Sequence, residues 1–121
     1  MLVYTGKILP NQPKENPKGN KEYKRKLIYD ETDTRGFKVK INKRATQMLY
    51  RILEGNGRAI YLLGVEDNGE ARGISLKELN RTIDILYKIA DIINAKIKIV
   101  RVYMGTKGFI GTVRIILNEM N

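Results

Sequence analysis

Apolar residues at intervals of three and four predict two amphipathic helices. The first spans about residues 43–54, with Asn42 as its cap. The second spans about residues 76–93 and begins after Ser75, which forms a capping-box pattern with Glu78. The stripe residues are Ala45, Met48, Leu49, Ile52 and Leu53 in the first helix, and Leu76, Leu79, Ile83, Leu86, Ala90 and Ile93 in the second.

Alternating and continuous apolar runs predict strands in the rest of the chain. In residues 36–42, for example, Phe37, Val39 and Ile41 alternate with lysines. Asn68-Gly69 suits a tight hairpin turn. The expected strands are residues 22–30, 36–42, 58–65, 70–74, 96–105 and 109–120. This order predicts one α+β domain, residues 21–121, with two helices packed on a mainly antiparallel sheet.

Residues 1–20 hold all three prolines of the chain among Asn, Lys and Gly. Because proline fixes one backbone dihedral and removes a hydrogen-bond donor, we expect a flexible basic arm with little regular structure. The segment has no apolar leader typical of a signal peptide, and no apolar run is long enough to span a bilayer. We therefore expect a cytoplasmic protein with no membrane partner.

Composition narrows the chemistry that the chain can perform. It contains no Cys and no His, which excludes thiolate or imidazole zinc sites and imidazole catalysis. Its net charge is +10, of which +7 falls on residues 1–44. Such an excess suits a polyanionic partner, although a thermophile's charged surface is an alternative explanation.

Several motifs give the chain a resemblance to known proteins. "EYKRKL", "TQMLYRILEGNGRAIYLLGVEDNG" and "RGIS" resemble the N-terminal region of a family of GTP-binding proteins related to translation elongation factors. The likeness covers roughly Glu22 to Val102 and implies a translational GTPase or the ribosome as a partner. No G-x-x-x-x-G-K-[ST] motif is present, so we expect no binding of GTP through a P-loop.

The same skeleton is similar to the nucleic-acid-binding core of Schlafen proteins, which implies a Schlafen/AlbA-like core. Some Schlafen cores cut structured RNA with three carboxylates and a divalent cation. Glu22 and Asp67 match two of these carboxylates by position. Pro17 stands where the third is expected, and Glu15 is a nearby substitute.

The favoured interpretation is a small RNA-binding domain that contacts the backbone of structured RNA, of the tRNA or rRNA class, by charge and shape. It requires no cofactor. The expected phosphate-contacting residues are Lys21, Lys24, Arg25, Lys26, Lys38, Lys40, Arg44 and Arg51.

One alternative is a metal-dependent endoribonuclease. Glu22 and Asp67, with Glu66 or Glu15, would hold Mg²⁺ or Mn²⁺, and Lys24 would stabilise the developing negative charge. This hypothesis expects Glu22 and Asp67 to approach each other near Glu54 or Arg51.

Two further alternatives stay open. The chain can be a module that docks a GTPase or ribosomal protein. In addition, residues 66–69 can be only a polar turn, and Gln47, Arg51 and Glu54 only a solvated helix face.

Overall fold

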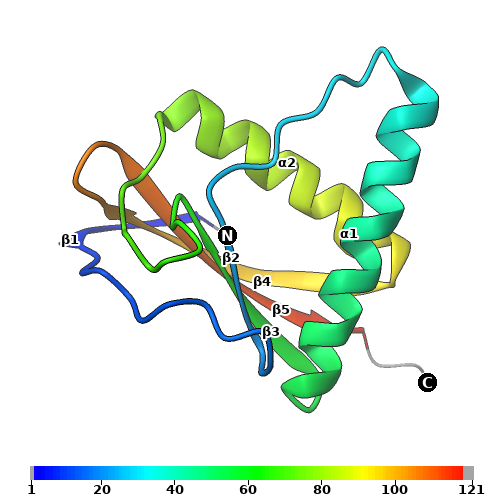
Figure 1. The fold of residues 1–121 in the computed structure, drawn as a ribbon, viewed down its shortest axis with the longest axis horizontal. Helices are drawn as coiled ribbons and strands as arrows, with labels where there is room; N and C mark the ends of the chain where they lie inside the picture. Colours follow the sequence, from blue (N-terminus) through cyan, green and yellow to red (C-terminus); the bar gives the residue numbers. More distant parts are fainter. Residues whose placement is uncertain (1, 119–121) are drawn as a thin grey trace.

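A five-stranded sheet with two helices on one side forms the body of the computed structural model, which describes residues 2–118 (Figure 1). The strand order is β1-β4-β5-β3-β2, so β1 and β2 are the edges. The elements are β1 (Leu2–Ile8), β2 (Lys21–Lys24), α1 (Thr34–Glu54), β3 (Arg58–Leu63), α2 (Leu76–Ile92), β4 (Ala95–Met104) and β5 (Phe109–Leu117).

The predicted α+β domain with two helices is confirmed, and the sheet is mixed. β5 pairs antiparallel with β3 and β4, whereas β1 pairs parallel with β4 and β2 pairs parallel with β3. A parallel neighbour needs a long crossover, and α1 supplies it between β2 and β3. The terminal hairpin predicted at residues 96–105 and 109–120 is present as β4 and β5; residues 119–120 lie outside the described range.

Alternation along β3 separates two apolar clusters on the two faces of the sheet. Ala59, Tyr61 and Leu63 point toward the helices and join the main core. Ile60 and Leu62 point the other way, into a smaller cluster with residues from the N-terminal segment and the loop after β3. The outer face of the sheet, defined here as the side away from the helices, is therefore covered at one end only.

The predicted strand at residues 36–42 is wrong, because α1 begins at Thr34 and continues to Glu54. Phe37 and Ile41 are four residues apart, so they also extend the helical stripe that continues at Ala45. Val39, which created the apparent alternation, is 62% exposed on the helix. The pattern satisfied both periods, and packing of the longer stripe decided between them.

Two more strand predictions need correction. Strand β2 ends at Lys24, so residues 25–30 of the predicted strand form a loop. Residues 70–74 make only an isolated bridge from Ile74 to Phe109. The turn before them is present, with the N–H of Gly69 donating to the carbonyl of Glu66 at 2.8 Å.

The expectation of little regular structure in residues 1–20 is wrong for Leu2–Ile8, which form β1. The segment after β1 packs on the loop that follows β3. Gln12 N donates to the carbonyl of Gly69 at 2.7 Å, and Glu15 N donates to that of Asp67 at 2.9 Å. A β-carbon on Gly69 would lie 1.9 Å from the Gln12 carbonyl oxygen, so glycine allows this close approach.

Within residues 2–118, neither helix combines the length and the apolar character that crossing a bilayer requires.

The corrected start of α1 gives a test by helix capping. The Asp33 side chain accepts a hydrogen bond from Gly36 N at 3.1 Å. We expect Asp33→Ala to destabilise the protein by about 1 kcal/mol. Asn42→Ala should leave stability unchanged or raise it by about 0.5 kcal/mol, because Asn42 lies inside the helix, where Ala is preferred. Urea unfolding measures both, and a larger loss for Asn42→Ala would contradict the observed helix start.

Candidate functional site

A buried ion pair joins α1 to β2. Glu22 on β2 is 1% exposed and Arg51 on α1 is 3% exposed, and Arg51 Nε lies 2.9 Å from Glu22 Oε1. Glu22 faces the helices because its register partner is Tyr61, a residue of the main core. Burial removes both charges from water, and their mutual attraction compensates for the lost hydration. The pair therefore fixes the position of α1 against the sheet edge.

Two further charged groups complete this cluster. Lys24 Nζ lies 3.3 Å from the second carboxylate oxygen of Glu22. Arg51 Nη2 lies 3.9 Å from Glu15 Oε2, and Glu15 also accepts a hydrogen bond from Tyr23 N. The cluster holds two carboxylates and two cations, so its charges balance. We refer to Glu15, Glu22, Lys24 and Arg51 as the charge cluster.

Burial raises the pKa of two acidic groups in and beside the charge cluster. Burial, followed by the nearby Glu22 carboxylate, raises the pKa of Glu15 above its ordinary value of 4.5, even though the Tyr23 N–H acts in the opposite direction. Burial and the charge of Glu22 also raise the pKa of the Tyr61 hydroxyl. A negative charge on Glu15 or Tyr61 is therefore unfavourable, and the positive charge of Arg51 partly compensates for it.

The same part of α1 holds the N-terminal segment in place. Arg51 Nη1 donates to the carbonyl of Gly19 at 2.9 Å, and Glu54 accepts from Gly19 N at 3.1 Å. The Tyr50 hydroxyl donates to the carbonyl of Pro17 at 3.2 Å. The interpretation of a solvated face is therefore wrong for buried Arg51, whereas Glu54 is exposed as expected and also contacts the N-terminal segment.

Gln47 stands one helical turn before Arg51 and is half-buried. Its Oε1 atom is buried without a hydrogen-bond partner among the described residues. Gln47 is thus only partly exposed, and its carbonyl end is packed into the protein.

Asp67 and Glu66 lie on the polar turn after β3. Asp67 is exposed, and its backbone carbonyl is what contacts Glu15. Glu66 pairs with Arg25 at 3.3 Å. Among residues 2–118, no hydrogen bond or ion pair joins Glu22 to the side chain of Asp67, and no group of three or more acidic residues is arranged to hold a metal ion.

A divalent cation at Glu22 would have to compete with Arg51 and Lys24, which already occupy both carboxylate oxygens. The metal site at Glu22, Asp67 and Glu66 stays a prediction, as does catalysis by Glu22, Asp67 and Lys24.

The eight predicted phosphate-contacting cations fall into two groups. Four are engaged with carboxylates, and four lie in none of the ion pairs of residues 2–118. Glu22 pairs with both Lys24 and Arg51. Glu66 pairs with Arg25, and Glu78 pairs with Lys26. Lys21, Lys38 and Lys40 are exposed, and half-buried Arg44 donates to the Tyr29 hydroxyl at 3.1 Å.

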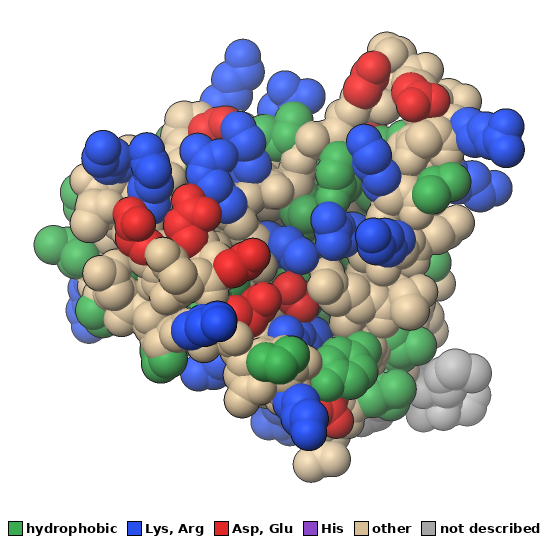
Figure 2. All heavy atoms as spheres, in the orientation of Figure 1, with side chains coloured by type: hydrophobic (Ala, Val, Ile, Leu, Met, Phe, Trp, Pro, Cys, Tyr) green, Lys and Arg blue, Asp and Glu red, His purple; other side chains and the backbone are tan. Residues whose placement is uncertain are grey.

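The first half of α1 carries more positive charge than the predicted set contained. Arg35 and Lys43 are exposed there beside Lys38, Lys40 and Arg44. The helix contains no acidic residue before Glu54. Figure 2 shows Lys and Arg side chains around this end of the molecule. We call these five residues the α1 cations. The sequence did not group them, because its pattern predicts a strand at residues 36–42 and not part of the helix.

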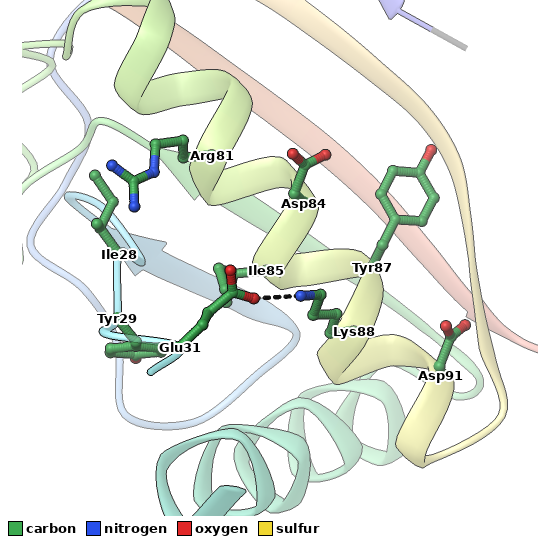
Figure 3. A pocket seen from close by; sticks show the side chains of 9 residues that line it. All are labelled: Ile28, Tyr29, Glu31, Arg81, Asp84, Ile85, Tyr87, Lys88 and Asp91. Carbon is green, nitrogen blue, oxygen red and sulfur yellow. Dashed lines mark hydrogen bonds and ion pairs between the residues drawn. The ribbon is translucent and has the colours of Figure 1, made fainter. Parts of the chain in front are cut away.

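A separate cavity of about 390 Å³ lies between α2 and the loop before α1 (Figure 3). Its α2 side carries Arg81 and Lys88 together with Asp84 and Asp91. Glu31 reaches across from the loop to pair with Lys88. Because charges of both signs alternate around it, this cavity favours no ligand of a single charge.

The buried ion pair predicts a large loss of stability from one substitution. Arg51→Met should reduce the free energy of unfolding by about 3–5 kcal/mol, because buried Glu22 would lose its closest counter-charge and keep only the more exposed Lys24. The double variant Arg51→Met/Glu22→Leu should be more stable than the single one. Exposed Arg35→Met is the control, with an expected change below about 0.5 kcal/mol. Denaturant unfolding decides, and equal losses for Arg51→Met and Arg35→Met would contradict the role of the pair.

The raised pKa of Glu15 predicts a pH dependence of defined sign. The folded protein holds a proton at Glu15 more tightly than the unfolded chain does, so this contribution to stability is full below pH 4.5 and is lost as the pH rises through the raised pKa. Glu15→Gln lacks this loss. Its stability relative to the parent protein should therefore improve as the pH rises, which urea unfolding from about pH 3 to pH 7 would measure.

Glu78→Gln provides the opposite control. A hydrogen bond from Lys26 lowers the pKa of Glu78 to about 2, so its contribution is present above the ordinary value of 4.5 and is lost as the pH falls. Relative to the parent, Glu78→Gln should therefore lose stability as the pH rises. Parallel trends for the two variants would contradict the assignment of Glu15.

Comparison with known proteins places most of the chain beside one segment of larger proteins. It is 35% identical over 92 residues to GTP-binding protein 2 of Mus musculus and of Homo sapiens, which covers 76% of this chain and 14% of each relative. It is 41% identical over 86 residues to uncharacterized protein R625 of Acanthamoeba polyphaga mimivirus, covering 70% of this chain and 43% of that protein.

No protein-family model and no solved structure matches the chain. The Schlafen-like core therefore stays a prediction. The sequence relation supports the other part of the resemblance: this chain is a domain related to a segment of a GTP-binding protein, and it spans 14% of the length of that relative.

Proposed function

We propose that this protein is an RNA-binding domain that contacts the phosphate backbone of structured RNA through the α1 cations. The observation that carries this proposal is a helix whose residues 34–44 hold five cations and no carboxylate. Phosphate contacts of this kind supply affinity that depends on charge and shape with little dependence on base sequence.

The placement of the α1 cations is unfavourable for the helix itself. The N-terminal end of a helix carries partial positive charge, so acidic residues normally stabilise the first turn and cations oppose it. Here the Asp33 cap supplies one carboxylate at the helix end, but the first turn, which begins at Thr34, contains Arg35 and no acidic residue. A bound polyanion would neutralise both the α1 cations and the helix end. Binding therefore explains an arrangement that does not stabilise the helix.

The related proteins suggest a setting for this activity. The segment that resembles our chain is part of proteins named GTP-binding protein 2. We propose cytoplasmic translation or RNA metabolism as the setting, with tRNA or rRNA as the class of ligand, because the motifs of the chain resemble GTP-binding proteins related to translation elongation factors.

The test is a titration of a labelled RNA hairpin at two salt concentrations. The protein should bind, and Lys38→Gln/Lys40→Gln/Lys43→Gln should flatten the log–log salt dependence by up to about three units, since each lost duplex contact accounts for about 0.9. Circular dichroism confirms that the variant remains folded.

A matched control removes three exposed lysines elsewhere, Lys7→Gln/Lys14→Gln/Lys107→Gln, so both variants have the same net charge. The control should keep most of the parent's salt dependence. Absent or salt-independent binding of the hairpin would overturn the proposal, and an equal effect of both variants would overturn the role of α1.

A second candidate is a module that docks a GTP-binding protein, favoured by the occurrence of a related segment within GTP-binding protein 2. Capture of a GTP-binding protein from lysate, undiminished by nuclease treatment, is the expected result for that function.

A further inference from the structure

The uncovered end of the outer face contains a groove of about 450 Å³ across β3, β5 and β4. Arg58, Lys98 and Arg114 line it, one from each of the three strands. The N-terminal segment and the loop after β3 pack on the other end of this face, over Leu62 and its neighbours. The groove thus begins where that covering ends.

The charge of this surface has one sign only. Strands β3, β4 and β5 contain no Asp or Glu. Arg58, Lys98 and Arg114 appear in none of the ion pairs of residues 2–118. Lys96, on the register position beside Ile116, is exposed as well. Three cations around one hollow without a carboxylate favour an anionic ligand.

The floor of the groove is apolar. Ile60, Ile99 and Ile116 line it and are half-buried. Ile60 and Ile99 are both register partners of Arg114, on either side of it. A bulge between Ile97 and Ile99 brings Lys98 to the rim next to Ile99. Cations around apolar side chains fit a ligand that has both phosphates and flat apolar faces.

We propose that this groove binds a single-stranded segment of RNA, with phosphates on Arg58, Lys98 and Arg114 and bases against the isoleucine floor. In a duplex the base faces are stacked inside the helix, whereas single strands can place unstacked bases on a protein surface. The volume of the groove lies within the range of about 300–1,000 Å³ found for small-ligand sites, enough for one nucleotide and part of its neighbours.

This inference rests on the proposed function, because it assigns a second surface to the same class of ligand. The two surfaces are independent: α1 packs on the inner face of the sheet, and the groove opens on the outer face. A hairpin with a single-stranded tail offers a ligand for each.

The experiment compares two variants of equal net charge against two RNAs. The sheet variant is Arg58→Gln/Lys98→Gln/Arg114→Gln, and the helix variant is Lys38→Gln/Lys40→Gln/Lys43→Gln. The RNAs are a blunt hairpin and a fluorescein-labelled single strand of about ten nucleotides, within the range of about 4–16 known for single-strand sites. Fluorescence anisotropy at several salt concentrations gives affinity and salt slope.

We expect the sheet variant to lose on the order of tenfold or more in affinity for the single strand and about two units of salt slope, from three contacts at about 0.7 each. The helix variant should retain the larger part of single-strand binding and lose more on the hairpin. A helix variant that loses as much single-strand affinity as the sheet variant would overturn the inference.

A third variant tests the floor separately from the charges. Ile99→Thr/Ile116→Thr keeps β-branched side chains, which suit a strand, and removes apolar surface. It should weaken single-strand binding several-fold with the salt slope unchanged, because no phosphate contact is lost. Unchanged affinity would overturn the contact between bases and the isoleucines.

The outcomes also separate this inference from the proposed function. Binding of the hairpin without binding of the single strand overturns the groove as an RNA site and leaves the function of α1 intact. Failure to bind either RNA overturns both.

Discussion

The ion pair between Arg51 and Glu22 is the constraint on which the arrangement of the chain depends. Both side chains are almost fully buried, so neither can regain water without moving α1 or the edge strand β2. Strand β2 has only four residues and hydrogen-bonds to β3 alone within the sheet. A strand this short needs anchors beyond its ladder, and Arg51 supplies one while also holding the carbonyl of Gly19.

Several acidic residues form ion pairs within the protein, and these pairs determine which cations remain available to a partner. Glu22, Glu66 and Glu78 take up cations at one edge of the molecule and in the adjoining loop. The first half of α1 and the outer face of the sheet have no such carboxylates within their elements. The net charge of the chain is concentrated on these two surfaces, not spread evenly over it.

The sequence was informative where one period dominated. Helix α2 and the terminal hairpin followed directly from their patterns, because Ser75 and Glu78 mark a helix start and alternating apolar residues mark strands. Residues 36–42 fitted both periods, and only packing against the main core assigned them to α1. Arg51 looked like a surface residue because its partner, Glu22, is 29 positions away and no local pattern reports such a contact. The groove on the outer face was equally hidden, since it needs the order of the strands.

The pairing of β1 with β4 has a consequence for the order in which the protein folds. The Thr5 hydroxyl donates a hydrogen bond to the carbonyl of Val102, which lies 97 positions later. A ribosome adds residues at about 5–20 per second, so β1 must wait several seconds without its neighbour while the rest is synthesised. Contacts between residues so distant in sequence also slow folding in general. Of the strands in this sheet, β1 is synthesised first and is among the last to join, and until then the edge of β4 that it covers stays open.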